Sequence, residues 1–179
     1  VMQSWSSGRH RLASGTPEDA LRLSPRAPWP YLFFGTNQRS WVENVAAAYD
    51  APGEWIGGAA GVRYRLAPGD TSPSTALLPL LRQLVVVAGD GPGGTPVQHL
   101  ELIDLGFAHS LATTPPGGWV DNQAAVDIGA AIEVDNARHV RITGCHITAT
   151  GGHAIWLRQN VRDSEVSGCT MTDLGGGAV

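Results

Sequence analysis

A short motif repeats near the end of the chain with a spacing of 23 to 24 residues. The residues AIEV at 131–134 return as AIWL at 154–157, and ITGC at 142–145 returns as VSGC at 166–169. The residues between them are rich in Asn, Asp and Gly, which favour turns. Short apolar runs joined by turns are typical of strands, so the repeat predicts a stack of similar β units.

The fold that best fits this spacing is all-β: a right-handed, single-stranded parallel β-helix, the pectin-lyase-like solenoid. In such a solenoid each strand pairs with its equivalent in the next coil, about 4.8 Å away, and like residues lie over one another. No coil buries its apolar residues alone, so the core forms only in the stack. The expected pairs are Ile142 with Val166, Cys145 with Cys169, and Ile147 with Met171.

An earlier coil precedes the repeat, because Leu102, Leu105 and Phe107 have the same spacing as Ile142, Cys145 and Ile147, 40 residues later. The longer spacing predicts an inserted loop over 110–129. The apolar run 84–87 and the turn-forming residues 89–94 mark the entry into the solenoid. We therefore predict a β-helix over 84–179 and a β-rich insertion or cap over 1–83, since open solenoid ends need a cover.

Within the first 83 residues, local patterns predict a few elements. Apolar residues at i, i+4 and i+8 over 41–49 indicate a short helix that ends near 50–53. Residues 54–56 and 62–66 flank a glycine-rich stretch and predict a hairpin. Strand candidates are 1–5 and 31–34.

Composition argues against several kinds of partner. The net charge is −4 and the basic residues, all arginine, form no block, so nucleic acid and anionic membrane surfaces are not expected partners. No apolar run is long enough to span a membrane. The chain starts without Met and stops within a strand-like motif, so we expect a piece of a longer protein that lacks N- and C-terminal parts.

The cysteines and histidines give no sign of a metal or cofactor. Cys145 and Cys169 fall in one inward column, which fits either a reduced packed pair, the simpler interpretation, or a disulfide between adjacent coils. The six histidines show no zinc-binding spacing, and residues 89–94 do not match a nucleotide-binding loop.

A set of short motifs, in order along the chain, resembles bacterial parallel β-helix proteins related to glycoside hydrolase family 141. The resemblance covers nearly the whole chain and implies a glycoside hydrolase that acts on plant or microbial polysaccharide, with fucosidase- or xylanase-like activity, and a secreted or periplasmic location. One departure is 56–58, where members usually have an aromatic and an acidic residue. The motifs are DAPGEW at 50–55, GVRY at 61–64, QAA at 123–125, AIE at 131–133, GGHAIWL at 151–157 and DLGGGAV at 173–179.

Asp173 is the candidate catalytic residue. The resemblance implies that an Asp in this Asp-Leu-Gly context belongs to a catalytic carboxyl pair, with its partner beyond Val179, so the 179-residue piece should be inactive alone. The glycines after it would allow a sugar close to the backbone. The alternative is an Asx turn, in which Asp173 caps its own backbone. Its own column holds Ala149 and His109, hence no second carboxylate.

Candidate substrate-binding residues lie on the inserted loop and on one strand face. Trp119 could stack on a sugar while Asp121 bonds its hydroxyls, unless this is a solvated loop. Glu133 and Trp156 occupy equivalent outward positions and indicate groove lining, the alternative being an ordinary exposed strand face. His153 adjoins this face, as a substrate contact or as a satisfied turn residue.

Two other functions remain open from the sequence. A polysaccharide lyase needs a base and a group that neutralises the uronate carboxylate, and only Arg158 offers the latter near Trp156. A non-catalytic β-helix for glycan binding or adhesion would bind saccharide without turnover and would be indifferent to Asp173→Asn.

Overall fold

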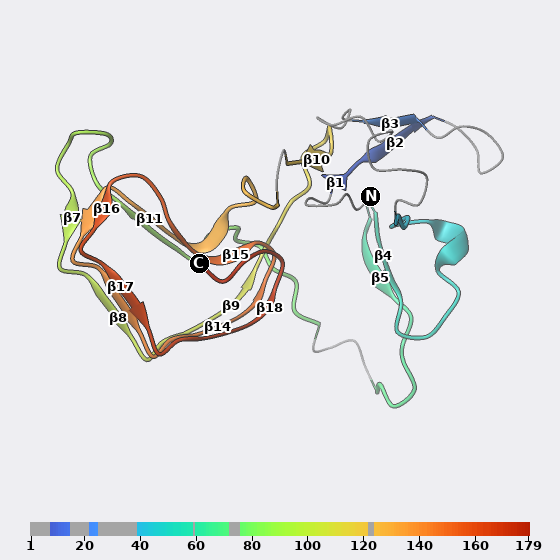
Figure 1. Ribbon diagram of the computed structural model, residues 1–179. Helices are drawn as coiled ribbons and strands as arrows, with labels where there is room; N and C mark the ends of the chain where they lie inside the picture. The colour runs from blue at the N-terminus through green and yellow to red at the C-terminus, as the bar shows by residue number, and fades with distance from the viewer. Residues whose placement is uncertain (1–7, 15–21, 25–38, 59, 72–75, 122–123) are drawn as a thin grey trace.

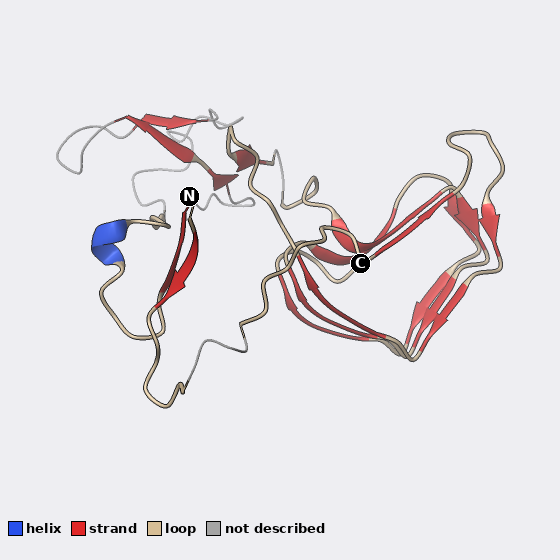
Figure 2. Cartoon of the chain, turned by 180° about the vertical axis from the view of Figure 1, so that it is seen from behind, coloured by secondary structure: helices blue, strands red, loops and turns tan. Residues whose placement is uncertain are grey.

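The computed structural model describes residues 8–14, 22–24, 39–58, 60–71, 76–121 and 124–179. Within these residues the protein is almost entirely β, with eighteen strands, one short 3-10 helix at Ala46–Ala48 and no α-helix (Figures 1 and 2). No helix there has the length and apolar character needed to cross a membrane. The predicted all-β class is confirmed.

Twelve strands form four parallel three-stranded sheets, each with one strand from each of three successive segments, 85–110, 130–150 and 153–174. The second segment always supplies the central strand, and Figure 1 shows the three segments lying over one another around a shared outline. The sheets are β6 (Val85–Ala88), β11 (Ala130–Asp135) and β15 (His153–Leu157); β7 (Val97–Gln98), β12 (Ala137–Arg138) and β16 (Val161–Arg162); β8 (Glu101–Ile103), β13 (Arg141–Thr143) and β17 (Glu165–Ser167); and β9 (Gly106–Ser110), β14 (His146–Thr150) and β18 (Thr170–Leu174).

The strand register confirms the predicted ladders of apolar side chains. Ile142 pairs with Leu102 on one side and with Val166 on the other. The same relation joins Ile147 to Phe107 and Met171. The repeat in the sequence is thus a repeat of strand positions in space.

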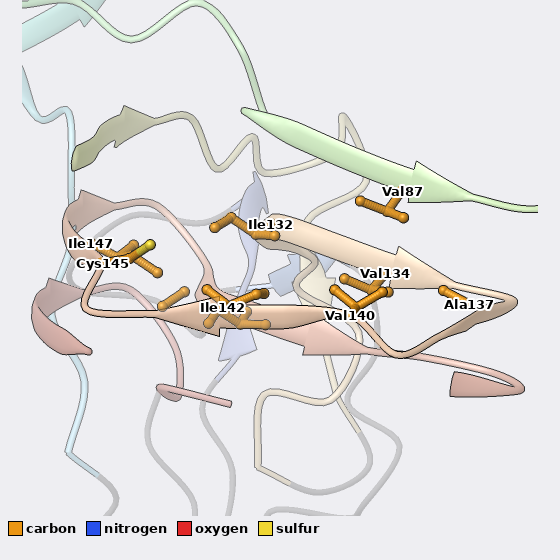
Figure 3. Packing of buried hydrophobic residues seen from close by; sticks show 10 residues of the cluster. Val87, Ile132, Val134, Ala137, Val140, Ile142, Cys145 and Ile147 are labelled. Atoms are coloured by element: carbon orange, nitrogen blue, oxygen red, sulfur yellow. The ribbon is translucent and has the colours of Figure 1, made fainter. Parts of the chain in front are cut away.

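The core lies inside these ladders and is tightest in the second segment (Figure 3). Ile132, Val134, Ile142 and Ile147 are all fully buried, because each has a strand neighbour above and below. Burial of one such side chain contributes about 1.5–3 kcal/mol. Residues of the outer segments, such as Val166, are only partly buried.

Cys145 and Cys169 are both free thiols, as the simpler interpretation of the sequence expected. Each thiol donates to a backbone carbonyl of the preceding segment: Cys145 Sγ to the Leu102 oxygen and Cys169 Sγ to the Ile142 oxygen, both at 3.4 Å. The cysteines therefore fill equivalent inward positions.

Residues with positive φ recur at the corners of successive segments. His109, Ala149 and Asp173 form one such column, with φ between 51° and 64°. At another corner Gly144, at φ 65°, has no room for a side chain, since an added Cβ would lie 2.1 Å from Asp104 Oδ1. Left-handed turns at fixed positions let each segment repeat the path of the one before.

A side-chain ladder of asparagines supports a third corner. The buried Asn136 amide donates to the Gly91 carbonyl at 2.9 Å, and Asn160 donates to Asn136 Oδ1 at 2.5 Å. These bonds satisfy buried polar groups where the chain turns.

The N-terminal part contains short antiparallel pairs. The predicted hairpin is confirmed as β4 (Trp55–Gly58) with β5 (Gly61–Tyr64). A second pair joins β2 (Arg11–Ser14) to β3 (Arg22–Ser24). The strand candidates at 1–5 and 31–34 lie outside the described residues, and the division at residue 83 stays a prediction.

The helix predicted over 41–49 is wrong apart from one 3-10 turn at Ala46–Ala48. Its apolar residues Trp41, Val42 and Val45 are all exposed, so no partner surface covers them. A helix this short is marginal without such packing, and Pro52 follows closely.

The inserted segment between β9 and β11 is present as predicted. It contains β10 (Trp119–Val120), which pairs antiparallel with β1 (Gly8–Arg9). This pairing brings the N-terminal part of the chain against the loop that walls the candidate site.

Candidate functional site

A cavity of about 620 Å³ lies over the outward face of β11 and β15, between the inserted segment and the N-terminal strand β1. It combines aromatic, basic and acidic side chains from distant parts of the sequence. These are Trp41, Trp119, Trp156, Arg9, Arg82, Arg158, Asp127 and Glu133.

Glu133 and Trp156 lie side by side in this cavity, because their strands pair in register. The neighbouring residues Ile132 and Val134 point into the core, as the alternation of a strand requires. The expectation that both residues line a groove therefore fits their position, but Glu133 is only 7% exposed. It forms a covered wall of the cavity, not an open floor.

Arg158 accounts for the cover over Glu133. Its Nη1 lies 3.2 Å from Glu133 Oε2 and its Nε lies 3.6 Å from Asp135 Oδ2. The guanidinium also stacks over the Trp156 ring, 4.7 Å from its centroid. Glu133 in addition accepts a hydrogen bond from the Ala130 backbone at 3.1 Å. One arginine is thus held by two carboxylates and an indole at the cavity wall.

Trp119 reaches the same cavity from the inserted segment, through β10. Its indole nitrogen is buried and has no hydrogen-bond partner among the described residues. A buried indole N–H normally has an acceptor, so a bound hydroxyl or water would fit here. The predicted stacking role for Trp119 stays a prediction with a suitable location.

Asp121 is not on a solvated loop, since it is 1% exposed and does not line the cavity. Neither carboxylate oxygen has a hydrogen-bond partner in the described part of the chain. Burial, and then the nearby Asp127 charge, raise the pKa of Asp121, while His153 acts in the opposite direction. This position does not present Asp121 to sugar hydroxyls in the cavity.

Both ring nitrogens of His153 are engaged by the backbone. Nδ1 accepts a hydrogen bond from the Gly177 N–H at 2.6 Å, and Nε2 donates to the Ala125 carbonyl at 2.8 Å. This geometry matches the satisfied turn histidine weighed in the sequence and leaves no ring nitrogen for a substrate.

Asp173 lies in a shallow hollow that adjoins the cavity. Ala149 and His109 lie next to it in its column, as the spacing predicted, and it has φ 53°. Its carboxylate makes no hydrogen bond or ion pair with any described residue, so no Asx turn is seen. The hollow shares its edge with the cavity through Arg9, Leu111, Ala112, Gly151 and Gly175.

Sequence reasoning missed Arg9, Trp41 and Arg82 as cavity residues. They precede the repeat by tens of residues and carry no motif, and only the β1–β10 pairing and the path into β6 bring them here. Within the described residues, no three His, Cys, Asp or Glu side chains come together as a metal site.

Comparison with protein-family models, with curated proteins and with solved structures gave no match.

Proposed function

We propose that the chain is part of a right-handed parallel β-helix that binds polysaccharide in this cavity and hydrolyses a glycosidic bond. The fold part of the proposal is supported by the three segments that repeat the same four parallel strands. The functional part is supported by one observation: the indoles of Trp119 and Trp156 line the same cavity as exposed polar groups. Flat aromatic faces beside hydrogen-bonding groups suit sugar rings.

In this proposal Asp173 supplies one of the two carboxyl groups that flank the scissile bond. Its carboxylate has no partner among the described residues and is exposed in the hollow beside the cavity. One carboxyl group of such a pair protonates the leaving oxygen, while the other activates water or attacks the anomeric carbon. Asp127 is an exposed carboxylate that lines the adjoining cavity, and it is the candidate within this chain for the second group if none follows Val179.

A lyase is the second candidate, because three arginines reach the cavity where the sequence had indicated only one. A guanidinium beside a uronate carboxylate would make the adjacent C–H more acidic. A carboxylate base then takes that proton, the bond to the leaving oxygen breaks, and a carbon–carbon double bond forms in the sugar.

The test is incubation of the protein with pectic and xylan oligosaccharides, with reducing ends and ultraviolet absorbance both followed. Hydrolysis produces reducing ends without new absorbance, whereas elimination produces an absorbing unsaturated uronate. Asp173→Asn should abolish turnover, and Asp163→Asn is the matched control, since Asp163 is also an exposed left-handed residue but lies outside both hollows. Saccharide binding without turnover, unchanged in Asp173→Asn, would support a non-catalytic glycan-binding protein instead.

A further inference from the structure

The cavity concentrates positive charge in a chain whose net charge is −4. Arg9, Arg82 and Arg158 all line it, against the two carboxylates Asp127 and Glu133. Neutral sugars need no such excess of guanidinium groups. The charge therefore points to an anionic feature of the ligand.

Arg82 is the least compensated of the three. It is exposed at the cavity wall and makes no ion pair with any described residue. The other two have acidic partners: Arg9 has Glu43 at 3.3 Å, and Arg158 has Glu133 and Asp135. An uncompensated guanidinium is free to bind an external carboxylate.

The backbone on either side of Arg82 is held in place. The Leu81 carbonyl accepts a hydrogen bond from Leu111 N at 2.7 Å, which ties the residue before Arg82 to the inserted segment. Leu84 N donates to the Ala131 carbonyl, also at 2.7 Å, which ties the following residues to β11. Arg82 is thus carried on a fixed strand entry.

Arg158 offers a second, pre-oriented group. Its Nε and Nη1 face Asp135 and Glu133, while Nη2 has no partner in the described part of the chain. Stacking on Trp156 fixes the plane of the guanidinium beside the aromatic face. A planar guanidinium matches a carboxylate well because it can donate two parallel hydrogen bonds.

We propose that the cavity selects a sugar that carries a carboxylate, a uronic acid residue, with Arg82 and the free edge of Arg158 as the carboxylate-binding groups. The ring of that sugar stacks on Trp156. This inference rests on the proposed saccharide binding and adds the class of sugar. Glu133 acts as a positioning residue, since it contacts Arg158 and not the ligand.

The experiment is calorimetric titration of the protein with oligogalacturonate and with the same oligosaccharide after its carboxylates are reduced to alcohols. The carboxylate form should bind roughly tenfold to a hundredfold more tightly, as expected for a charge-assisted hydrogen bond. Added salt should weaken only that form. Arg82→Gln should remove most of the difference between the two ligands.

Arg138→Gln is the matched control, because it removes the same charge from an exposed position on β12 that does not line the cavity. Arg158→Gln leaves Glu133 buried without its partner and is therefore used only if its circular dichroism spectrum is unchanged. Equal binding of both ligands, unaffected by Arg82→Gln, would overturn the uronate inference and leave saccharide binding intact. A sulfated neutral oligosaccharide that binds as tightly would overturn the carboxylate assignment. No binding of any saccharide would overturn both the inference and the proposed function.

Discussion

Glu133 and Arg158, 25 residues apart, form an ion pair at 3.2 Å that joins β11 to the residue after β15. The carboxylate is buried and the guanidinium is partly exposed, so the pair closes one wall of the cavity. The same register that aligns the apolar core therefore also positions the polar wall.

Glu133→Gln should lower the free energy of unfolding by about 1.5–3 kcal/mol, the usual contribution of a hydrogen bond to a charged group. Urea unfolding measures this loss. Glu101→Gln is the control, because its 2.9 Å pair with Arg141 is exposed on both sides and should contribute less than about 1 kcal/mol. Equal losses in the two variants would contradict a special role for the Glu133 pair.

Asp121→Asn should stabilise the protein at neutral pH. Because the folded state raises the pKa of Asp121, its proton is held more tightly there than in the unfolded chain, where the pKa is about 3.9. The favourable contribution of this group is thus complete at low pH, below the unfolded value, and is lost as the pH rises through the raised folded value. The asparagine removes that loss.

Thermal unfolding at acidic and neutral pH checks this linkage. The difference in melting temperature between Asp121→Asn and the parent should grow as the pH rises, while exposed Asp90→Asn should show no such trend. A constant difference, or a variant less stable at neutral pH, would be the opposite of the expected result.

Gly144→Ala should destabilise the fold by about 1–3 kcal/mol, because the new Cβ would meet Asp104 at a left-handed position. Gly106→Ala on β9 is the control, since nothing lies within 4 Å of an added Cβ there. Chemical denaturation compares the two. A tolerated Gly144→Ala would show that the corner is not fixed as described.

Ile142→Ala should cost about 2–5 kcal/mol, as for other buried apolar truncations. Ile142 is fully buried in the central strand of its sheet, whereas Ile103 on the neighbouring β8 is 47% exposed. Ile103→Ala should therefore have a much smaller effect in the same urea titration. Similar effects would contradict the inward and outward assignment of these two positions.

The ladders of like residues were predictable because a fixed spacing leaves only one register in which Ile142 meets both Leu102 and Val166. The hairpin at 55–64 was predictable from its glycines. The short helix was not, since its formation depends on packing that local periodicity does not reveal. Arg82 and Arg9 could not be placed in the cavity, because their position depends on β1–β10 pairing and on the entry into β6. Nor could the burial of Asp121, which the packing of the inserted segment determines.

The central claim is that sugars bind against the Trp156 face of the cavity. The most direct measurement is calorimetric titration of pectic and xylan oligosaccharides into the parent protein, Trp156→Ala and Trp55→Ala, the last being an exposed tryptophan on β4 that does not line the cavity. We predict binding by the parent, no change in Trp55→Ala and a loss of roughly tenfold or more in Trp156→Ala, since one stacked aromatic pair contributes about 0.5–1.5 kcal/mol beyond its buried area. Binding that survives unchanged in Trp156→Ala, or no saccharide binding by the parent protein, would contradict the account.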